Sequence, residues 1–178
     1  MKKKVIAFDL DGTLSPSKSP LPDRMSELLN KLLERVQVCV ISGGKFTQFE
    51  KQLLSNLNAS PTKLESLHLM PTCGTRYFVF NIPKNNWHQV YAEDLTKKEK
   101  DKIINALNKG FDDLHMREKK TWGESIEDRD SQITFSVLGQ DIVEKLGDKG
   151  IRMKEAWDKN DIKKQKLRDY ISKLIPEF

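Results

Sequence analysis

The first 60 residues alternate between two hydrophobic patterns. Residues 5–8 and 36–41 are short, mostly apolar runs, which are typical of strands buried in a parallel sheet. Between them, apolar side chains recur every three or four positions, which predicts a helix that begins at Pro22 or Asp23. A second segment with helical spacing follows the second run. The apolar residues of the two predicted helices are Met25, Leu28, Leu29, Leu32, Leu33 and Val36, and then Phe46, Phe49, Leu53 and Leu57.

Strand, helix, strand and helix in this order predict an α/β fold with a doubly wound parallel sheet. In such sheets the ligand site lies at the carboxyl ends of the strands. Residues 67–70 and 76–80 are predicted to be two further short strands, separated by a turn at residues 71–74. Asn81 and Pro83 then break the apolar pattern, so we expect one domain over residues 1–81 and another over residues 82–178.

The second predicted domain has an α+β pattern. Thr96 and Glu99 have the spacing of a capping box, which predicts the start of a helix with Leu107 and Phe111 on its buried face. Residues 132–138 alternate between apolar and polar, as in a strand of an antiparallel sheet. A last helix is expected from Asp158 or Asp161 to Ile175. Helices that cover one face of an antiparallel sheet form a layer distinct from a parallel core.

Two acidic residues follow the first apolar run. Side chains at i and i+2 of a strand point the same way, so Asp9 and Asp11 can share one site. Gly12 lets the chain turn, and the Thr13 hydroxyl can orient a carboxylate or bond a phosphate oxygen. One acid can attack phosphorus as a nucleophile while the other transfers the leaving-group proton. The alternative is a pair of solvated acids at an ordinary strand-to-turn junction.

The second predicted strand ends in Ser42, Gly43 and Gly44. A hydroxyl beside unpaired backbone N–H groups at a helix start can bind phosphate oxygens. The alternative is an ordinary serine N-cap followed by flexible glycines. Lys45 could add a phosphate contact, although a solvated helix face is the simpler interpretation.

The sequence Asp-Leu-Asp-Gly-Thr at residues 9–13 resembles the first motif of the haloacid dehalogenase-like superfamily of aspartyl phosphotransferases. Ser42, at the end of the second predicted strand, resembles the second motif. The resemblance implies that Asp9 is the phosphorylated nucleophile and Asp11 the general acid/base. It also implies a haloacid dehalogenase-like core followed by a cap domain. A Mg²⁺ cofactor would be held by Asp9 and the backbone carbonyl of Asp11. An acid at position 11 favours phosphatases and phosphomutases, because branches that do not protonate an alcohol carry another residue there.

Residues 126–129, Ile-Glu-Asp-Arg, are similar to a cap segment of eukaryotic-type phosphomannomutases. There, two arginines grip the phosphate that is not transferred. Arg129 matches the first arginine, and a guanidinium suits a phosphate, but Gln140 occupies the position of the second. A mutase must hold a phosphate at each end of its substrate, whereas hydrolysis does not need the second clamp. The alternative for Arg129 is a surface ion pair with Glu127 or Asp128.

Two later motifs of the superfamily are not recognisable in the sequence. These are the lysine that balances charge and the Gly-Asp-x-x-x-Asp motif that completes the Mg²⁺ shell. Gly147 and Asp148 are not preceded by an apolar strand, and Lys154 lies in the wrong context to be that lysine. Asp9 and Asp11 alone offer few oxygens for a tight Mg²⁺ site. We therefore expect the sequence to be truncated or a gene fragment.

Composition is that of a globular protein. The 178 residues are 37% apolar and 32% charged, and the net charge of +5 indicates either a lysine-rich surface or a preference for anionic ligands. The three histidines lack metal-ligand spacing, and the two cysteines suggest no disulfide framework. Too few apolar residues follow the first lysines for a signal peptide. We expect a cytoplasmic protein with no membrane or nucleic-acid partner; the sequence does not indicate an oligomeric state.

Together these features predict a Mg²⁺-dependent phosphatase that acts on a small phosphorylated metabolite, with a sugar phosphate as the favoured substrate. The reaction would pass through an aspartyl phosphate. Two alternatives stay open: a phosphomannomutase-like phosphosugar mutase, and a catalytically incomplete fragment that binds phosphate.

Overall fold

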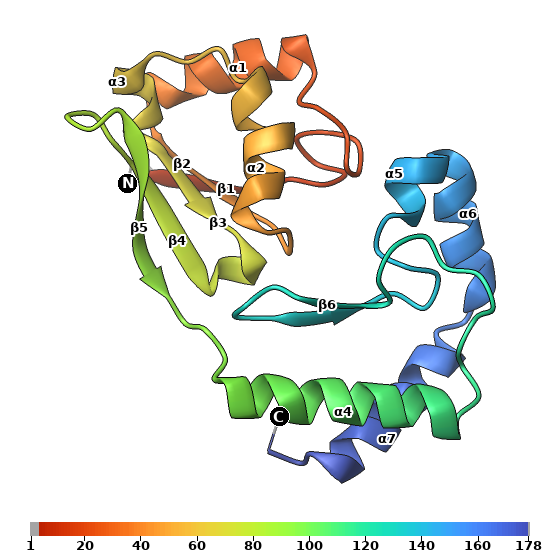
Figure 1. Cartoon of the computed structure of the whole chain (residues 1–178). Coiled ribbons are helices and arrows are strands. Elements are labelled where there is room, and N and C mark those ends of the chain that lie inside the picture. Colours follow the sequence, from red (N-terminus) through yellow and green to blue (C-terminus); the bar gives the residue numbers. More distant parts are fainter. Residues whose placement is uncertain (1–3, 178) are drawn as a thin grey trace. The chain divides into compact units, whose positions relative to one another are not determined.

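The computed structural model describes residues 4–177, and the chain divides into two compact units, Met1–Asp94 and Leu95–Phe178 (Figure 1). The expected boundary after Asn81 instead lies inside a β-hairpin of the first unit. Strand β4 (Arg76–Asn81) pairs antiparallel with β5 (Asn86–Ala92), and Asn85 N–H donates to the carbonyl of Ile82 across the turn (3.0 Å). The residues that break the apolar pattern thus form a hairpin turn, and the chain returns along the same sheet before it enters the second unit.

The first unit is built on a five-stranded sheet in the order β1-β2-β3-β4-β5. Strands β1 (Val5–Asp9), β2 (Gln37–Ile41) and β3 (Leu67–Met70) are parallel, and β4 and β5 extend the sheet in antiparallel fashion. The predicted α/β class with a parallel-rich sheet is confirmed. Strand β5 was not predicted, because the alternation in residues 86–92 places polar or exposed side chains at most positions.

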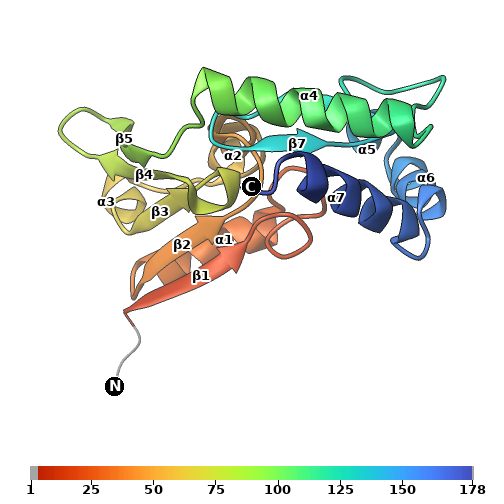
Figure 2. The ribbon, with the colours of Figure 1, turned by 90° about the horizontal axis from the view of Figure 1, so that it is seen from below.

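Three helices pack on one face of this sheet. They are α1 (Asp23–Leu33), α2 (Phe46–Gln52) and α3 (Pro61–Leu64), with short 3-10 turns η1 (Leu54–Asn56) and η2 (Thr72–Gly74). The strand order advances in one direction from β1 to β3, so right-handed crossovers bring the connecting helices to the same side. Figure 2 shows α1 on the far side of β1 and β2. Their shared core consists of Leu29 and Leu33 from α1, Phe49 from α2, and Val38, Val40, Leu67, Leu69 and Phe78 from the strands, with neighbouring loop residues.

The face of the sheet away from these helices is more polar. Two hydrogen bonds cross it: His68 Nδ1 lies 2.7 Å from Tyr77 Oη, and His68 Nε2 lies 2.6 Å from Gln37 Oε1. Burial lowers the pKa of His68. On β1, Val5 and Asp9 alternate with Ile6 and Phe8 and are exposed, so the side chain of Asp9 belongs to this more open face.

The second unit contains a long helix, a two-stranded sheet and three further helices. The elements are α4 (Lys97–Asp113), β6 (Ile126–Asp128), β7 (Ile133–Phe135), α5 (Ile142–Leu146), α6 (Asp148–Trp157) and α7 (Ile162–Leu174). The predicted capping box is confirmed: Glu99 N–H donates to Thr96 Oγ1 (3.3 Å) and Thr96 N–H to Glu99 Oε2 (2.7 Å). Strand β7 lies within the strand predicted over residues 132–138 and pairs antiparallel with β6, which was not predicted. Helices α5 and α6 were not predicted.

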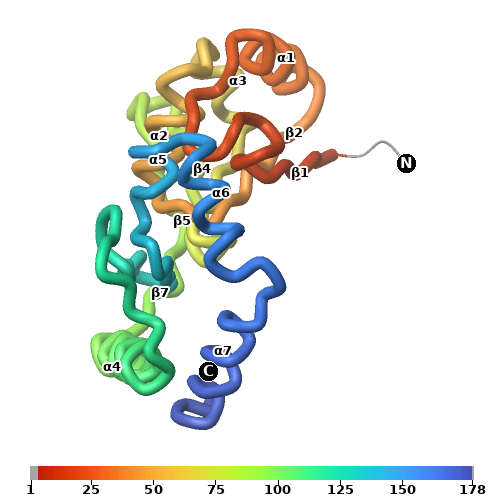
Figure 3. Tube along the Cα trace, turned by 90° about the vertical axis from the view of Figure 1, so that its right-hand side faces the viewer, coloured from red at the N-terminus to blue at the C-terminus, as the bar shows by residue number. Residues whose placement is uncertain are grey.

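Helices α4 and α7 lie side by side (Figures 1 and 3). Gly110 permits the approach, because a Cβ at this position would lie 2.6 Å from Leu167 Cδ1. Leu167, Phe111, Met116 and Val137 form the core of this unit. None of the helices in residues 4–177 is both long and apolar enough to span a bilayer.

Two adjacent leucines on α1 test the assignment of the core. Leu29 is 2% exposed and Leu28 is 44% exposed. We predict that Leu29→Ala lowers the free energy of unfolding by about 2–5 kcal/mol, since it removes buried methyl groups and leaves a cavity. Leu28→Ala should change it by roughly 0.5 kcal/mol or less, because the side chain is largely in water in both states. Urea unfolding of the two variants measures the difference, and equal losses would contradict the packing.

The lowered pKa of His68 predicts a pH dependence of stability. The unfolded chain binds a proton at this residue near pH 6.5, whereas the folded chain binds it only at lower pH. The stabilisation is therefore complete above about pH 6.5 and is lost as the pH falls through the lowered pKa. His68→Gln should flatten the pH dependence of urea unfolding in this range. A slope that His68→Gln leaves unaltered would contradict the assignment.

Candidate active site

The carboxyl ends of the parallel strands meet at one edge of the sheet. Asp9 pairs with Ile41 in the ladder of β1 and β2, and Ile41 pairs with Met70 in the ladder of β2 and β3. The loops that follow the three strands therefore leave the sheet at the same level. The structure brings the two segments predicted for the site, residues 9–13 and 42–44, to neighbouring strand ends.

The turn after β1 keeps both predicted catalytic acids accessible. Leu10, between them, is fully buried, and its carbonyl accepts hydrogen bonds from the N–H groups of Leu14 and Ser15 (3.1 Å each). Gly12 has φ +80°, a conformation that favours glycine. Asp9 is exposed and Asp11 is partly exposed, so neither carboxylate is sealed beneath the core. Thr13 is exposed in the same turn.

The Asp11 carboxylate is held by three hydrogen-bond donors. Its Oδ1 accepts from the backbone N–H of Lys18 (2.7 Å) and from Gln52 Nε2 (3.1 Å), and its Oδ2 accepts from Gln48 Nε2 (3.0 Å). The two glutamines lie on α2 and were not predicted as site residues. Their spacing of four residues places them on one helix face, but amides at this spacing carry no sign of a ligand in the sequence.

The loop after β2 is tied to the loop after β3. Cys73 N–H donates to the Ser42 carbonyl (3.0 Å), and Thr72 N–H donates to the Gly44 carbonyl (2.9 Å). The Ser42 side chain is buried, and its Oγ accepts from Gly44 N–H (3.4 Å). Helix α2 begins only at Phe46, with Lys45 at its N-cap, so Ser42 is not the N-cap that the sequence left as an alternative.

Arg129 lies in the second unit, directly after β6. Its Nε and Nη2 donate to Glu127 Oε2 (2.9 and 2.7 Å), and the two side chains are 14% and 28% exposed. The ion pair that the sequence left as the alternative for Arg129 is therefore present. Gln140, at the position of the expected second arginine, donates from Nε2 to Thr134 Oγ1 (3.4 Å).

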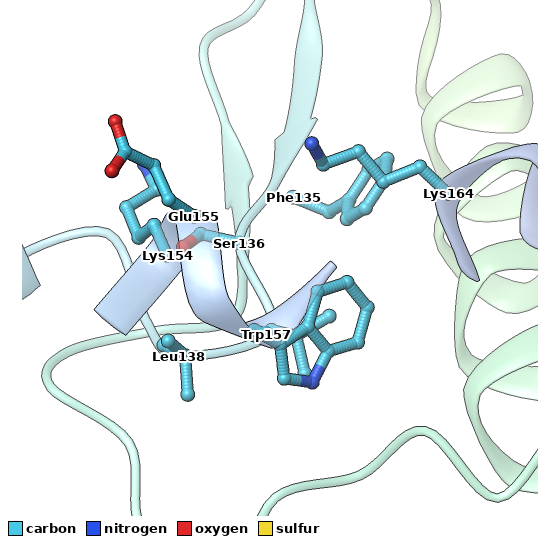
Figure 4. A pocket seen from close by; sticks show the side chains of 8 residues that line it. Phe135, Ser136, Leu138, Lys154, Glu155, Trp157 and Lys164 are labelled. Atoms are coloured by element: carbon cyan, nitrogen blue, oxygen red, sulfur yellow. The ribbon is translucent and has the colours of Figure 1, made fainter. Parts of the chain in front are cut away.

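The second unit also contains a recess of about 340 Å³ (Figure 4). Figure 4 shows the rings of Phe135 and Trp157 beside it, with Lys164 on the helix α7 side. It is lined by Phe135, Ser136, Val137, Leu138, Lys154, Glu155, Trp157 and Lys164. Arg129 is not among the lining residues, and Glu155 is the one acid among them. The recess therefore does not contain the paired carboxylates that acid/base chemistry requires.

The ligands available for Mg²⁺ can be compared with what the ion needs. Mg²⁺ in phosphoryl-transfer sites is bound by one or two carboxylates, substrate phosphate oxygens and several waters. Within residues 4–177, no group of three or more histidine, cysteine, aspartate or glutamate side chains could hold a metal ion. The Asp9 carboxylate and the Asp11 backbone carbonyl fit part of such a shell, with the remainder left to other ligands.

Comparison with known proteins identifies the family of this chain. The profile of the haloacid dehalogenase-like hydrolases matches residues 6–176. A phosphomannomutase from Encephalitozoon cuniculi is 24% identical over 151 residues, which are 78% of this chain and 51% of that protein. Phosphomannomutase 1 from Mus musculus is 36% identical over 53 residues, 29% of this chain and 20% of that protein. The chain thus spans about half the length of the Encephalitozoon relative.

Solved structures of Plasmodium falciparum IMP-nucleotidase share the fold. One matches with a TM-score of 0.54 and 16% identity, covering 89% of this chain and 47% of that chain. A mutant of the same enzyme, bound to IMP, matches with a TM-score of 0.56 and 14% identity, covering 97% of this chain and 55% of that chain. The parallel register, the acids after β1 and the match over residues 6–176 lead to one conclusion: the chain belongs to the haloacid dehalogenase-like hydrolase family.

Proposed function

We propose that the protein is a phosphatase that transfers the phosphoryl group of a small metabolite to Asp9 and then to water. The observation that carries the proposal is the pair of acids after β1: Asp9 is exposed at the strand end, and Asp11 is held two residues further on by three donors. The match to phosphomannomutases supports a sugar phosphate as the substrate.

The reaction has two displacements at phosphorus. In the first, an Asp9 carboxylate oxygen forms a bond to phosphorus, the bond to the leaving oxygen breaks, and that oxygen takes a proton from Asp11. In the second, a water oxygen attacks the aspartyl phosphate, gives its proton to Asp11, and the bond between phosphorus and Asp9 breaks. Both residues return to their starting states, and one water is consumed for each phosphate released.

The remaining predicted residues would bind the phosphate and the cofactor. The hydroxyls of Thr13 and Ser42 and the backbone of Gly43 and Gly44 would contact phosphate oxygens. When bound by Asp9 and the Asp11 carbonyl, Mg²⁺ would offset the repulsion between the carboxylate and the phosphate. The remaining ligands of the ion would include substrate phosphate oxygens and waters, as is usual for Mg²⁺ in phosphoryl transfer.

The second unit would act as the cap, which excludes water and selects the substrate. We place this cap in residues 95–178 rather than 82–178, because β5 belongs to the first sheet. Arg129 would contact substrate from here by exchanging its bond to Glu127 for a phosphate. We also propose a cytoplasmic location, without membrane or nucleic-acid partners.

A mutase is the second candidate, because the curated relatives are phosphomannomutases. Hydrolysis is favoured because Gln140 is neutral where a mutase would hold the second phosphate. We predict that phosphate release from sugar monophosphates needs no sugar bisphosphate. Measuring release with and without added bisphosphate distinguishes the two. A strict requirement for the bisphosphate, together with isomerised product, would support the mutase.

The role of Asp9 as nucleophile is tested by the Asp9→Asn variant of the full-length protein. We predict a loss of Mg²⁺-dependent phosphate release from p-nitrophenyl phosphate by at least about 10³-fold, since the amide cannot form the acyl phosphate. Asp23→Asn, at the exposed start of α1, is the matched control and should retain wild-type turnover. Turnover that Asp9→Asn does not reduce would remove Asp9 from this role. If no form of the protein hydrolyses or isomerises any phosphate ester, the phosphate-binding fragment is the remaining alternative.

A further inference from the structure

The two glutamines on α2 form a closed hydrogen-bond network with Asp11. Gln48 Nε2 donates to Asp11 Oδ2 (3.0 Å) and to Gln52 Oε1 (2.6 Å). Gln52 Nε2 donates to Asp11 Oδ1 (3.1 Å) and to the Ser19 carbonyl (3.1 Å). Each amide nitrogen faces two acceptors, and the Gln52 amide oxygen faces a donor. This pattern fixes which way both amides point.

Gln52 is built into the fold. It is 5% exposed, and its backbone carbonyl accepts from Leu21 N–H (2.7 Å), so backbone and side chain both anchor the loop that follows Asp11. The place of Gln48 depends on Gly44: a Cβ there would lie 2.2 Å from Gln48 Oε1. A buried amide that is fully hydrogen-bonded is costly to misplace, so the network holds one arrangement.

The two carboxylate oxygens of Asp11 accept different numbers of hydrogen bonds in this network. A carboxylate has about four lone-pair sites, two on each oxygen. Oδ1 uses both of its sites, since it accepts from Lys18 N–H and from Gln52. Oδ2 accepts only from Gln48 among the described residues, so one of its sites stays available.

We propose that Gln48 and Gln52 are positioning residues for the acid/base step, and that Asp11 exchanges its proton with the substrate through Oδ2. The proposal rests on the function given above. The two amides hold the carboxylate so that Oδ2 presents its open site to the leaving oxygen and afterwards to the attacking water. Proton transfer by a positioned group contributes about 10²–10⁴-fold to such reactions, and this gain depends on orientation.

The dependence of kcat/KM on the leaving group distinguishes a positioning role of the two glutamines from a purely structural one. An alkyl phosphate needs a proton on its leaving oxygen, whereas p-nitrophenolate leaves without one. In Gln48→Met and Gln52→Met we expect kcat/KM for an alkyl phosphate to fall by about 10²-fold, while kcat/KM for p-nitrophenyl phosphate changes by only about threefold. The ratio is informative because kcat/KM reports the step in which the leaving group departs. Gln89→Met, an exposed change on β5, should leave both values at those of the wild type.

The use of two variants allows the proposal to be tested even if one of them fails to fold. Gln48→Met keeps the bonds of Gln52 with Ser19 and Leu21, so it should remain folded, as circular dichroism would show, even if Gln52→Met does not. An equal fall with both substrates, or no fall with either, would overturn the positioning role and leave the proposed function intact. Hydrolysis that survives Asp9→Asn would overturn the proposed function itself, and with it the role of Asp11 and its two glutamines.

Discussion

The parallel pairing of β1 with β2 is the constraint on which the candidate site depends. Register places Asp9 level with Ile41, so the turn that carries Asp11 and the loop that carries Ser42 begin at the same height. A shift by one residue would turn Asp9 toward the helices and bury a carboxylate among leucines, which is strongly unfavourable. The buried valines of β2 and leucines of β3 fix this register, so the packing of the core also determines where the two acids lie.

The hydrogen bonds from α2 to Asp11 fix the position of the second acid as well. Asp9 is at a strand end and exposed, which suits a group that must reach a phosphorus atom. Asp11 instead is tied to Gln48 and Gln52, and through Gln52 to the loop at Ser19 and Leu21. The same helix packs Phe49 into the core, so its amide face is positioned by its apolar face. Two acids two residues apart thus have different surroundings, as the two roles proposed for them require.

Much of this could be predicted from the sequence. The apolar runs predicted β1 and β2, the helical spacing predicted α1 and the capping box predicted the start of α4, because each is a local pattern with a local cause. Strand β5 was not predicted because it is held by pairing with β4 rather than by an apolar face. Gln48 and Gln52 were not predicted because a buried amide network depends on contacts across 37 and 41 residues.

The covalent phosphoryl group on the enzyme is the most direct evidence for or against Asp9 as the nucleophile. The protein can be mixed with substrate, quenched in acid during turnover and digested, and the peptides weighed by mass spectrometry. If Asp9 is the nucleophile, the peptide that carries it will bear an acid-stable, base-labile phosphoryl group, and the same peptide from Asp9→Asn will bear none. Turnover without phosphorylation of that peptide, or with phosphate on another residue, would contradict this role of Asp9.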